Sequence, residues 1–183
     1  MRHLTLALLL SGCGFSAEIR DMVSTGKITA LEEDGLVVYP GSNPPDFSGE
    51  YTFNTMEISY DSDGDAYSLS QYNQTLAAPD EDNAVAFDDE ETVRAAASGT
   101  GDGCFSLFRE VEVEQTGCTL LYVEILTGCL VSQGIADPQA ALIISEADGT
   151  GCESAFMDEG DRRIFTEVDG MALRTELLST LYD

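Results

Sequence analysis

Two runs of alternating residues joined by a short turn constrain the fold of this chain most strongly. Residues 105–114 and 119–126 place β-branched, aromatic and other apolar side chains at every second position, the spacing of a strand with one buried face. The intervening residues include Thr116-Gly117, which suits a tight two-residue turn. We therefore predict an antiparallel hairpin in which Gln115 pairs with Cys118.

This register assigns a partner to each residue of the hairpin. Counting outward from the turn places Arg109 beside Glu124, an opposite-charge pair of the kind that stabilises neighbouring strands. Farther out, Cys104 stands opposite Cys129 in a non-hydrogen-bonded position. The Cα atoms of such a pair lie about 4.5 Å apart, which is within the range of a disulfide.

Four cysteines that each follow a glycine, Cys104, Cys118, Cys129 and Cys152, allow three disulfide pairings. A single extended strand would hold Cys118 and Cys129 about 35 Å apart, so these two do not bond to each other. The register favours Cys104–Cys129 with Cys118–Cys152, and Cys104–Cys118 with Cys129–Cys152 is the alternative. Each bridge would contribute about 2 to 4 kcal/mol in an oxidising compartment.

Further short runs predict more strands at residues 49–60, 66–72, 140–145 and 164–168, with turn-forming residues between them. The tail, residues 171–182, has leucines at helical spacing, and we expect a short C-terminal helix there, with a hairpin turn at Asp169-Gly170 as the alternative. The chain is thus predicted to be mainly β: a disulfide-stapled antiparallel sandwich or small barrel.

Residues 13–48 differ from this β-rich part because they are polar and acidic and end in a run of turn formers at residues 39–45. We predict an acidic tether over this segment and a single β-rich domain over residues 49–183. Two short features interrupt the tether: a helical turn at residues 19–23 and an edge strand at residues 36–39.

The first twelve residues have the layout of an export signal, in which Arg2 and His3 precede an apolar run that ends in small residues. That run is shorter than the roughly 20 residues of a membrane-spanning helix, and no later stretch reaches this length. The junction Leu10-Ser11-Gly12-Cys13 resembles the lipobox of bacterial lipoproteins. The resemblance covers residues 1–13, and it implies that residues 1–12 are a cleaved signal peptide and that Cys13 is lipidated.

A lipidated cysteine with several acyl chains anchors a protein stably, because each buried methylene contributes about 0.8 kcal/mol. The resemblance therefore implies a bacterial envelope protein held to a membrane through its N-terminus. Gly14 stands where an aspartate would favour retention in the inner membrane, so the outer membrane is the expected location.

Acidic side chains dominate the composition, with 34 aspartates and glutamates against 8 lysines and arginines and a formal net charge of −26. Such a charge repels phosphate backbones and anionic headgroups, and it excludes nucleic-acid binding. The surplus fits solubility in a salty medium, calcium binding or a cationic partner.

Histidine chemistry is excluded as well, because the only histidine, His3, lies in the predicted signal peptide. Ser-His-Asp and Cys-His catalysis and imidazole zinc sites need this side chain. The only lysine, Lys27, lies in the predicted tether, which disfavours Schiff-base chemistry. We therefore expect no catalytic residues and no enzyme, since an enzyme would have to work with carboxylates alone.

Asp61, Asp63 and Asp65 have the spacing of the first three ligands of a calcium loop. The rest of that motif is absent, because Ala66 replaces the glycine of the sharp turn and Tyr72 replaces the bidentate glutamate. A solvated hairpin turn is the favoured interpretation, with calcium as the one cofactor considered.

Two other groups of side chains have a structural and a functional interpretation. Glu110, Glu112 and Glu114 share one strand face and could hold an ion or form an acid/base pair, although such a row is more often a solvated face. A set of aromatic residues could line a ligand pocket but is more simply the core: Tyr51, Phe53, Tyr67, Phe105, Phe108 and Tyr122.

These features predict a lipid-anchored binding or structural β-domain in the bacterial envelope, with a protein or small-molecule partner that the sequence leaves open. A calcium-binding surface module is the first alternative, and a carboxylate-based hydrolase is the second.

Overall fold

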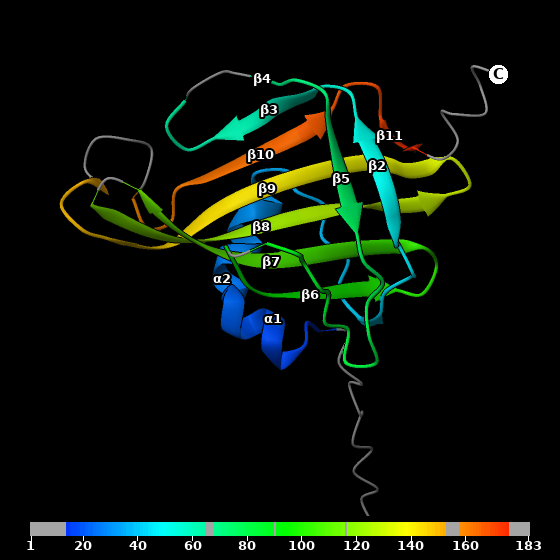
Figure 1. Ribbon diagram of the computed structural model, residues 1–183, viewed down its shortest axis with the longest axis horizontal. Helices are drawn as coiled ribbons and strands as arrows, with labels where there is room; N and C mark the ends of the chain where they lie inside the picture. The colour runs from blue at the N-terminus through cyan, green and yellow to red at the C-terminus, as the bar shows by residue number, and fades with distance from the viewer. Residues whose placement is uncertain (1–13, 65–67, 90, 116, 153–157, 176–183) are drawn as a thin grey trace, which may run out of the picture.

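The computed structural model describes residues 14–64, 68–89, 91–115, 117–152 and 158–175. Within them the protein is mainly β, as predicted, with two short helices ahead of eleven strands (Figure 1). The helices are α1 (Ala17–Met22) and α2 (Thr25–Glu33). The strands are β1 (Ser42–Asn43), β2 (Gly49–Phe53), β3 (Met56–Asp61), β4 (Ser68–Leu69), β5 (Tyr72–Leu76), β6 (Thr92–Thr100), β7 (Cys104–Gln115), β8 (Cys118–Val131), β9 (Gly134–Asp148), β10 (Arg162–Glu167) and β11 (Met171–Arg174).

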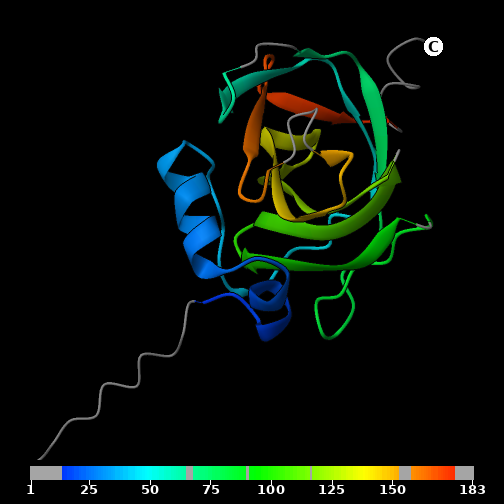
Figure 2. The same ribbon diagram turned by 90° about the vertical axis from the view of Figure 1, so that its left-hand side faces the viewer.

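The described strands form one open sheet. Its main path runs β1-β6-β7-β8-β9-β10-β3-β4, and a branch from β9 continues through β11 and β2 to β5. All pairs are antiparallel except β1 with β6. Figure 2 shows the sheet curling strongly, with both helices outside the curl.

The branch in the sheet begins where the ladder of β9 is interrupted. The first residues of β9 pair with β11, whereas the residues from Gln139 onward pair with β10. Between them lie Asp137, whose φ is 48°, and Pro138, which has no N–H to donate. The pairing with β8 shifts at the same level, between Thr127 and Cys129. This irregularity lets β9 serve two sets of neighbours.

The predicted central hairpin is present in the predicted register. β7 and β8 pair from Gln115 with Cys118 out to Cys104 with Cys129, although Thr116 of the turn lies outside the described residues. Both favoured disulfides, Cys104–Cys129 and Cys118–Cys152, are formed. The first joins paired strands, and the second ties the turn of the hairpin to the chain beyond β9.

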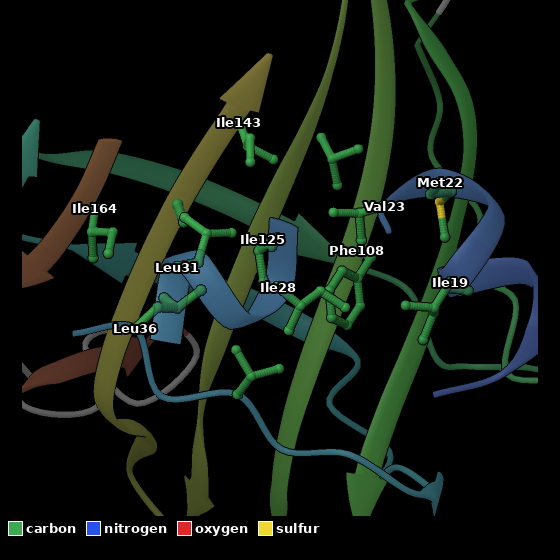
Figure 3. Packing of buried hydrophobic residues seen from close by; sticks show 14 residues of the cluster. Ile19, Met22, Val23, Ile28, Leu31, Leu36, Phe108, Ile125, Ile143 and Ile164 are labelled. Carbon is green, nitrogen blue, oxygen red and sulfur yellow. The ribbon is translucent and has the colours of Figure 1, made fainter. Parts of the chain in front are cut away.

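Each face of the β7–β9 ribbon buries its own apolar cluster because side chains alternate along every strand. We call the side of Phe108, Ile125 and Ile143 the outer face, and it packs against Ile28 and Leu31 of α2 (Figure 3). The opposite side is the inner face, where one end is filled by a second cluster that includes Phe47, Tyr51, Phe53, Phe105 and Leu107.

The expectation of an acidic tether over residues 13–48 is wrong for the described residues from Gly14 onward. Ile19, Leu31 and Phe47 are completely buried, and the first two belong to the outer-face cluster. Each helix begins at a serine cap: the Ile19 N–H donates to Ser16 Oγ (3.2 Å), and the Lys27 N–H donates to Ser24 Oγ (3.3 Å). Short capped helices need few apolar residues, so their sequence is mostly polar.

Residues 36–39, predicted as an edge strand, run beside the sheet without joining its ladder. The Tyr39 N–H donates to Ser106 Oγ (2.9 Å), and Ser98 Oγ donates to the Tyr39 carbonyl (2.7 Å). Serine hydroxyls thus replace the backbone partners of a strand. Parallel pairing with β6 starts only at Ser42.

The strand predicted over residues 49–60 is two strands, β2 and β3, separated by a corner at Asn54 and Thr55. The buried carboxylate of Glu167 accepts both backbone N–H groups of this corner, at 3.1 and 3.2 Å. The predicted return strand over residues 66–72 corresponds to β4, which pairs with β3, and to the start of β5, which pairs with β2.

The predicted start of the C-terminal helix is wrong, because Met171–Arg174 form β11, and Thr175 is the first residue of the tail with helical structure. Ala172 in this strand is completely buried, and the strand closes the branch between β9 and β2. The hairpin-turn alternative at Asp169-Gly170 is wrong as well, because β10 and β11 are both antiparallel to β9 and therefore run in the same direction. Gly170, whose φ is 67°, belongs to a local turn between them. Residues 176–183 lie outside the described part.

Candidate ligand-binding cavity

A half-open cavity lies on the inner face beyond its packed end. The cavity measures about 620 Å³, within the range of about 300 to 1,000 Å³ that is usual for small-molecule sites. Its apolar lining comes from four adjacent strands and includes Leu107, Leu126, Ala140, Leu142 and Phe165. Residues 69–74, which lead from β4 into β5, and Phe87 line it as well.

The position of the cavity follows from the strand register. Leu107, Leu126 and Ala140 lie side by side on β7, β8 and β9, and Phe165 continues the row on β10. The next row along the strands consists of Arg109, Glu124 and Leu142. An apolar row therefore borders a row that carries two opposite charges.

Arg109 is the centre of a polar network in the cavity wall. Its Nη1 donates to Glu124 Oε2 (2.9 Å), its Nη2 to Asp89 Oδ2 (2.8 Å), and its Nε to Thr92 Oγ1 (2.8 Å). The Arg109–Glu124 pairing is the one that the hairpin register predicts. The guanidinium thus joins β7, β8 and the loop before β6.

That loop is held over the cavity by two further contacts. The other oxygen of Asp89 accepts the N–H of Thr92 (2.7 Å) and the Thr92 hydroxyl (2.7 Å), and these hydrogen bonds, with burial opposing them, lower the pKa of Asp89. The ring centroid of Phe87 lies 4.7 Å from the Arg109 guanidinium carbon. Arg109 therefore fixes both a charged and an aromatic side chain of the loop.

Burial shifts the pKa values of titratable groups in the cavity wall and of Tyr122 beside it. Burial raises the pKa of Glu124, against the opposing effect of Arg109. Burial also raises the pKa of Tyr72 and of Tyr122 to about 12, and the charge of Glu124 adds to both shifts. An uncharged or ion-paired group is therefore favoured here over an exposed charge.

The Tyr72 phenol is expected to ionise with a midpoint near pH 12 in the folded protein, against about 10 in the unfolded chain. The folded state then holds a proton that the unfolded state loses, so stability falls as the pH rises from 10 to 12. Tyrosinate absorbance is recorded within seconds of a pH jump for the wild type and for Tyr72→Phe. The difference between the two titration curves gives the midpoint of Tyr72. A midpoint near 10 would contradict a buried phenol.

The predicted calcium ligands are not gathered around a free site. One oxygen of Asp61 accepts from Arg163 Nε (2.6 Å), and the other accepts the Asp63 N–H (2.8 Å), as in a hydrogen-bonded turn. Asp65 lies outside the described residues. Within the part of the chain that the structure describes, no three acidic or cysteine side chains are arranged to hold a metal ion.

Of the three glutamates in the row, one forms an ion pair and two are exposed to solvent. Glu110 is buried and accepts two hydrogen bonds from Arg94, from Nε (2.7 Å) and Nη2 (3.2 Å), whereas Glu112 and Glu114 are exposed. All three lie on the outer side of β7, away from the cavity. The solvated-face interpretation therefore fits the outer two.

Most of the aromatic set belongs to the core, as expected. Tyr51, Phe53, Phe105 and Phe108 are completely buried, Tyr122 is half-buried, and Tyr67 lies outside the described residues. Sequence reasoning missed Tyr72 and Phe87 as cavity residues, since both come from segments outside the central strands. The sequence feature that could have indicated the cavity is Arg109. It is a charged residue at a position of the alternating run that is otherwise apolar, and it lies opposite Glu124.

Comparisons with known proteins give no relative for this arrangement. No protein-family model, no curated protein and no solved structure matches the chain. Among the described helices, none has the length and apolar character that a membrane crossing requires. Cys13, the predicted lipidation site, lies outside the described residues.

Proposed function

We propose that this protein is a lipid-anchored protein of the bacterial envelope whose β-domain binds a small, largely apolar molecule in the inner-face cavity. The observation that carries the proposal is the cavity itself: about 620 Å³, with an apolar row across four strands and polar groups that include the Arg109–Glu124 ion pair. Small-molecule sites have this composition, in which apolar contact supplies affinity and a few polar groups supply orientation.

A binding role is favoured over the hydrolase alternative by the carboxylates of the cavity. A hydrolase that works without histidine needs two carboxyl groups facing one bond of the substrate. Glu124 is the only acidic side chain among the described residues that line the cavity, and it is paired with Arg109. A ligand can bind beside this pair without a second acid.

The anchor would place the domain close to a membrane. Three residues separate the lipid-bearing Cys13 from the start of α1 at Ala17, and these four extended steps span at most about 14 Å. Phe15, within this short link, packs edge-on against Phe108, with ring centroids 5.6 Å apart. We therefore propose that the domain lies against the bilayer, in the outer membrane by the lipobox resemblance, where apolar ligands are concentrated.

Filling the cavity tests the proposal. Ala140 is a small residue on the apolar lining, so Ala140→Phe places a ring in the ligand space. We expect the wild-type protein to bind the neutral fluorophore N-phenyl-1-naphthylamine with a blue-shifted emission, and Ala140→Phe to weaken this binding at least about tenfold, the equivalent of 1.4 kcal/mol. Fluorescence titration of the detergent-extracted protein measures both.

Val131→Phe is the matched control, because Val131 is an exposed residue of β8 that does not line the cavity. It should bind the fluorophore like the wild type. Equal binding by Ala140→Phe and the wild type would show that the fluorophore sits elsewhere, and no binding by the wild type would remove the proposed function.

A further inference from the structure

Acidic side chains outnumber basic ones around the cavity. Arg109 is the only cationic side chain among the described residues that line it. Glu124 and Asp89 both form ion pairs with this arginine, and Glu91 follows Asp89 in the same loop, where its N–H donates to the Asp89 carboxylate (3.2 Å). One guanidinium is therefore shared by two carboxylates, with a third acidic residue in the same loop, and the network around Arg109 has a negative excess.

Glu124 has one carboxylate oxygen that accepts no hydrogen bond from another described residue. Its Oε2 accepts from Arg109, no hydrogen bond from another described residue reaches its Oε1, and its side chain is 38% exposed, on the cavity wall. A carboxylate oxygen accepts strongly from an ammonium group, because the donor and the acceptor then carry opposite charges.

Aromatic rings lie beside this carboxylate. Phe87 and Tyr72 both line the cavity, and Phe87 already has the guanidinium of Arg109 4.7 Å from its ring centroid. The face of an aromatic ring attracts a cation within about 6 Å, and the attraction grows when the site is poorly solvated. Rings and carboxylate thus favour the same charge on a ligand.

We infer that the cavity binds an organic cation: a molecule with an apolar body and an ammonium group. The body would contact Leu107, Leu126 and Leu142, and the ammonium group would donate to Glu124 beside the aromatic rings. An anionic ligand fits poorly, because it would have to compete with Glu124 and Asp89 for Arg109. This inference rests on the proposed function, since it specifies the ligand of the same cavity.

Three competitors of equal chain length test the charge preference: octylammonium, octanol and octanoate, each displacing N-phenyl-1-naphthylamine from the full-length, detergent-extracted protein. We expect octylammonium to displace the fluorophore at a concentration about tenfold below that of octanol, which corresponds to 1.4 kcal/mol. Octanoate should be the weakest of the three.

The variant Glu124→Gln keeps the shape of the side chain and removes its charge, so octylammonium should become no better than octanol. Glu114→Gln removes a charge from an exposed position of the outer face and should keep the full preference. Because Glu124→Gln also takes an ion pair from Arg109, Glu91→Gln provides a second variant, with an exposed side chain and a smaller expected loss.

The outcomes separate this inference from the function on which it rests. If the fluorophore binds and octylammonium is no stronger than octanol, or if octanoate is the strongest competitor, the cation preference is wrong and the binding function stands. If Glu114→Gln reduces the preference as much as Glu124→Gln, a general surface charge is responsible and the inference is wrong. If no fluorophore binds, both proposals fail.

Discussion

Replacing Leu31 with alanine is expected to lower the free energy of unfolding by about 2 to 5 kcal/mol, the usual cost of removing a buried leucine side chain. Leu31 is completely buried in α2 and belongs to the cluster that covers the outer face. In a solvated tether, the same substitution would leave the free energy of unfolding almost unchanged. Urea unfolding of the purified protein, followed by circular dichroism, measures the difference.

Glu32→Ala is the control, because Glu32 is the next residue of α2 and is exposed. It should change the free energy of unfolding by less than about 0.5 kcal/mol. If Leu31→Ala is as mild as Glu32→Ala, the N-terminal helices do not pack on the sheet, and residues 14–48 would be the tether that their composition predicts.

Replacing Cys13 with serine is expected to abolish lipid attachment completely, because the lipobox resemblance places the acyl-bearing thiol at this residue. Cells expressing the wild type should incorporate labelled palmitate into the protein, and cells expressing Cys13→Ser should incorporate none. Without acyl chains the anchor loses about 0.8 kcal/mol for each buried methylene. Fluorography of the immunoprecipitated protein gives the result.

Ser16→Ala changes a residue just beyond the lipobox and should leave the palmitate label intact. Because Ser16 caps α1, this control also shows that a local change in the domain does not affect lipidation. Palmitate incorporated by Cys13→Ser, or by neither protein, would contradict the lipoprotein proposal and leave the cavity proposal standing.

The central hairpin was predictable in detail because its information is local. The turn at Gly117 fixes the register of β7 and β8, and that register brings Cys104 to Cys129 and Arg109 to Glu124. With Cys104 paired to Cys129, Cys118 and Cys152 remained for the second disulfide, and the structure has this bond. Pairing across a short turn follows from counting residues, and counting needs no knowledge of the rest of the fold.

The N-terminal segment was not predictable in this way, because its structure depends on a partner far along the chain. Ile19 and Leu31 are isolated apolar residues in a polar sequence, and they are buried only because the outer face of the sheet receives them. The corner between β2 and β3 depends likewise on Glu167, more than 100 positions away.

The cavity combines both kinds of information. Its Arg109–Glu124 pair follows from the hairpin register, but its other wall comes from residues 69–74 and from Phe87, whose positions result from the curl of the sheet. Tyr72 illustrates the difference: in the sequence it ends a predicted return strand, and in the structure it stacks on Phe53, with ring centroids 4.9 Å apart. Alternation predicts which way a side chain points, and only the tertiary fold shows what it faces.

The most direct test of ligand binding in the inner-face cavity is photolabelling of the detergent-extracted protein with a neutral, apolar diazirine probe, followed by peptide mass mapping. The account predicts one label per chain, on cavity residues such as Leu107, Leu126 and Leu142, and its loss in Ala140→Phe. Labels on the exposed apolar residues Val93 and Val168, unaffected by Ala140→Phe, would contradict it.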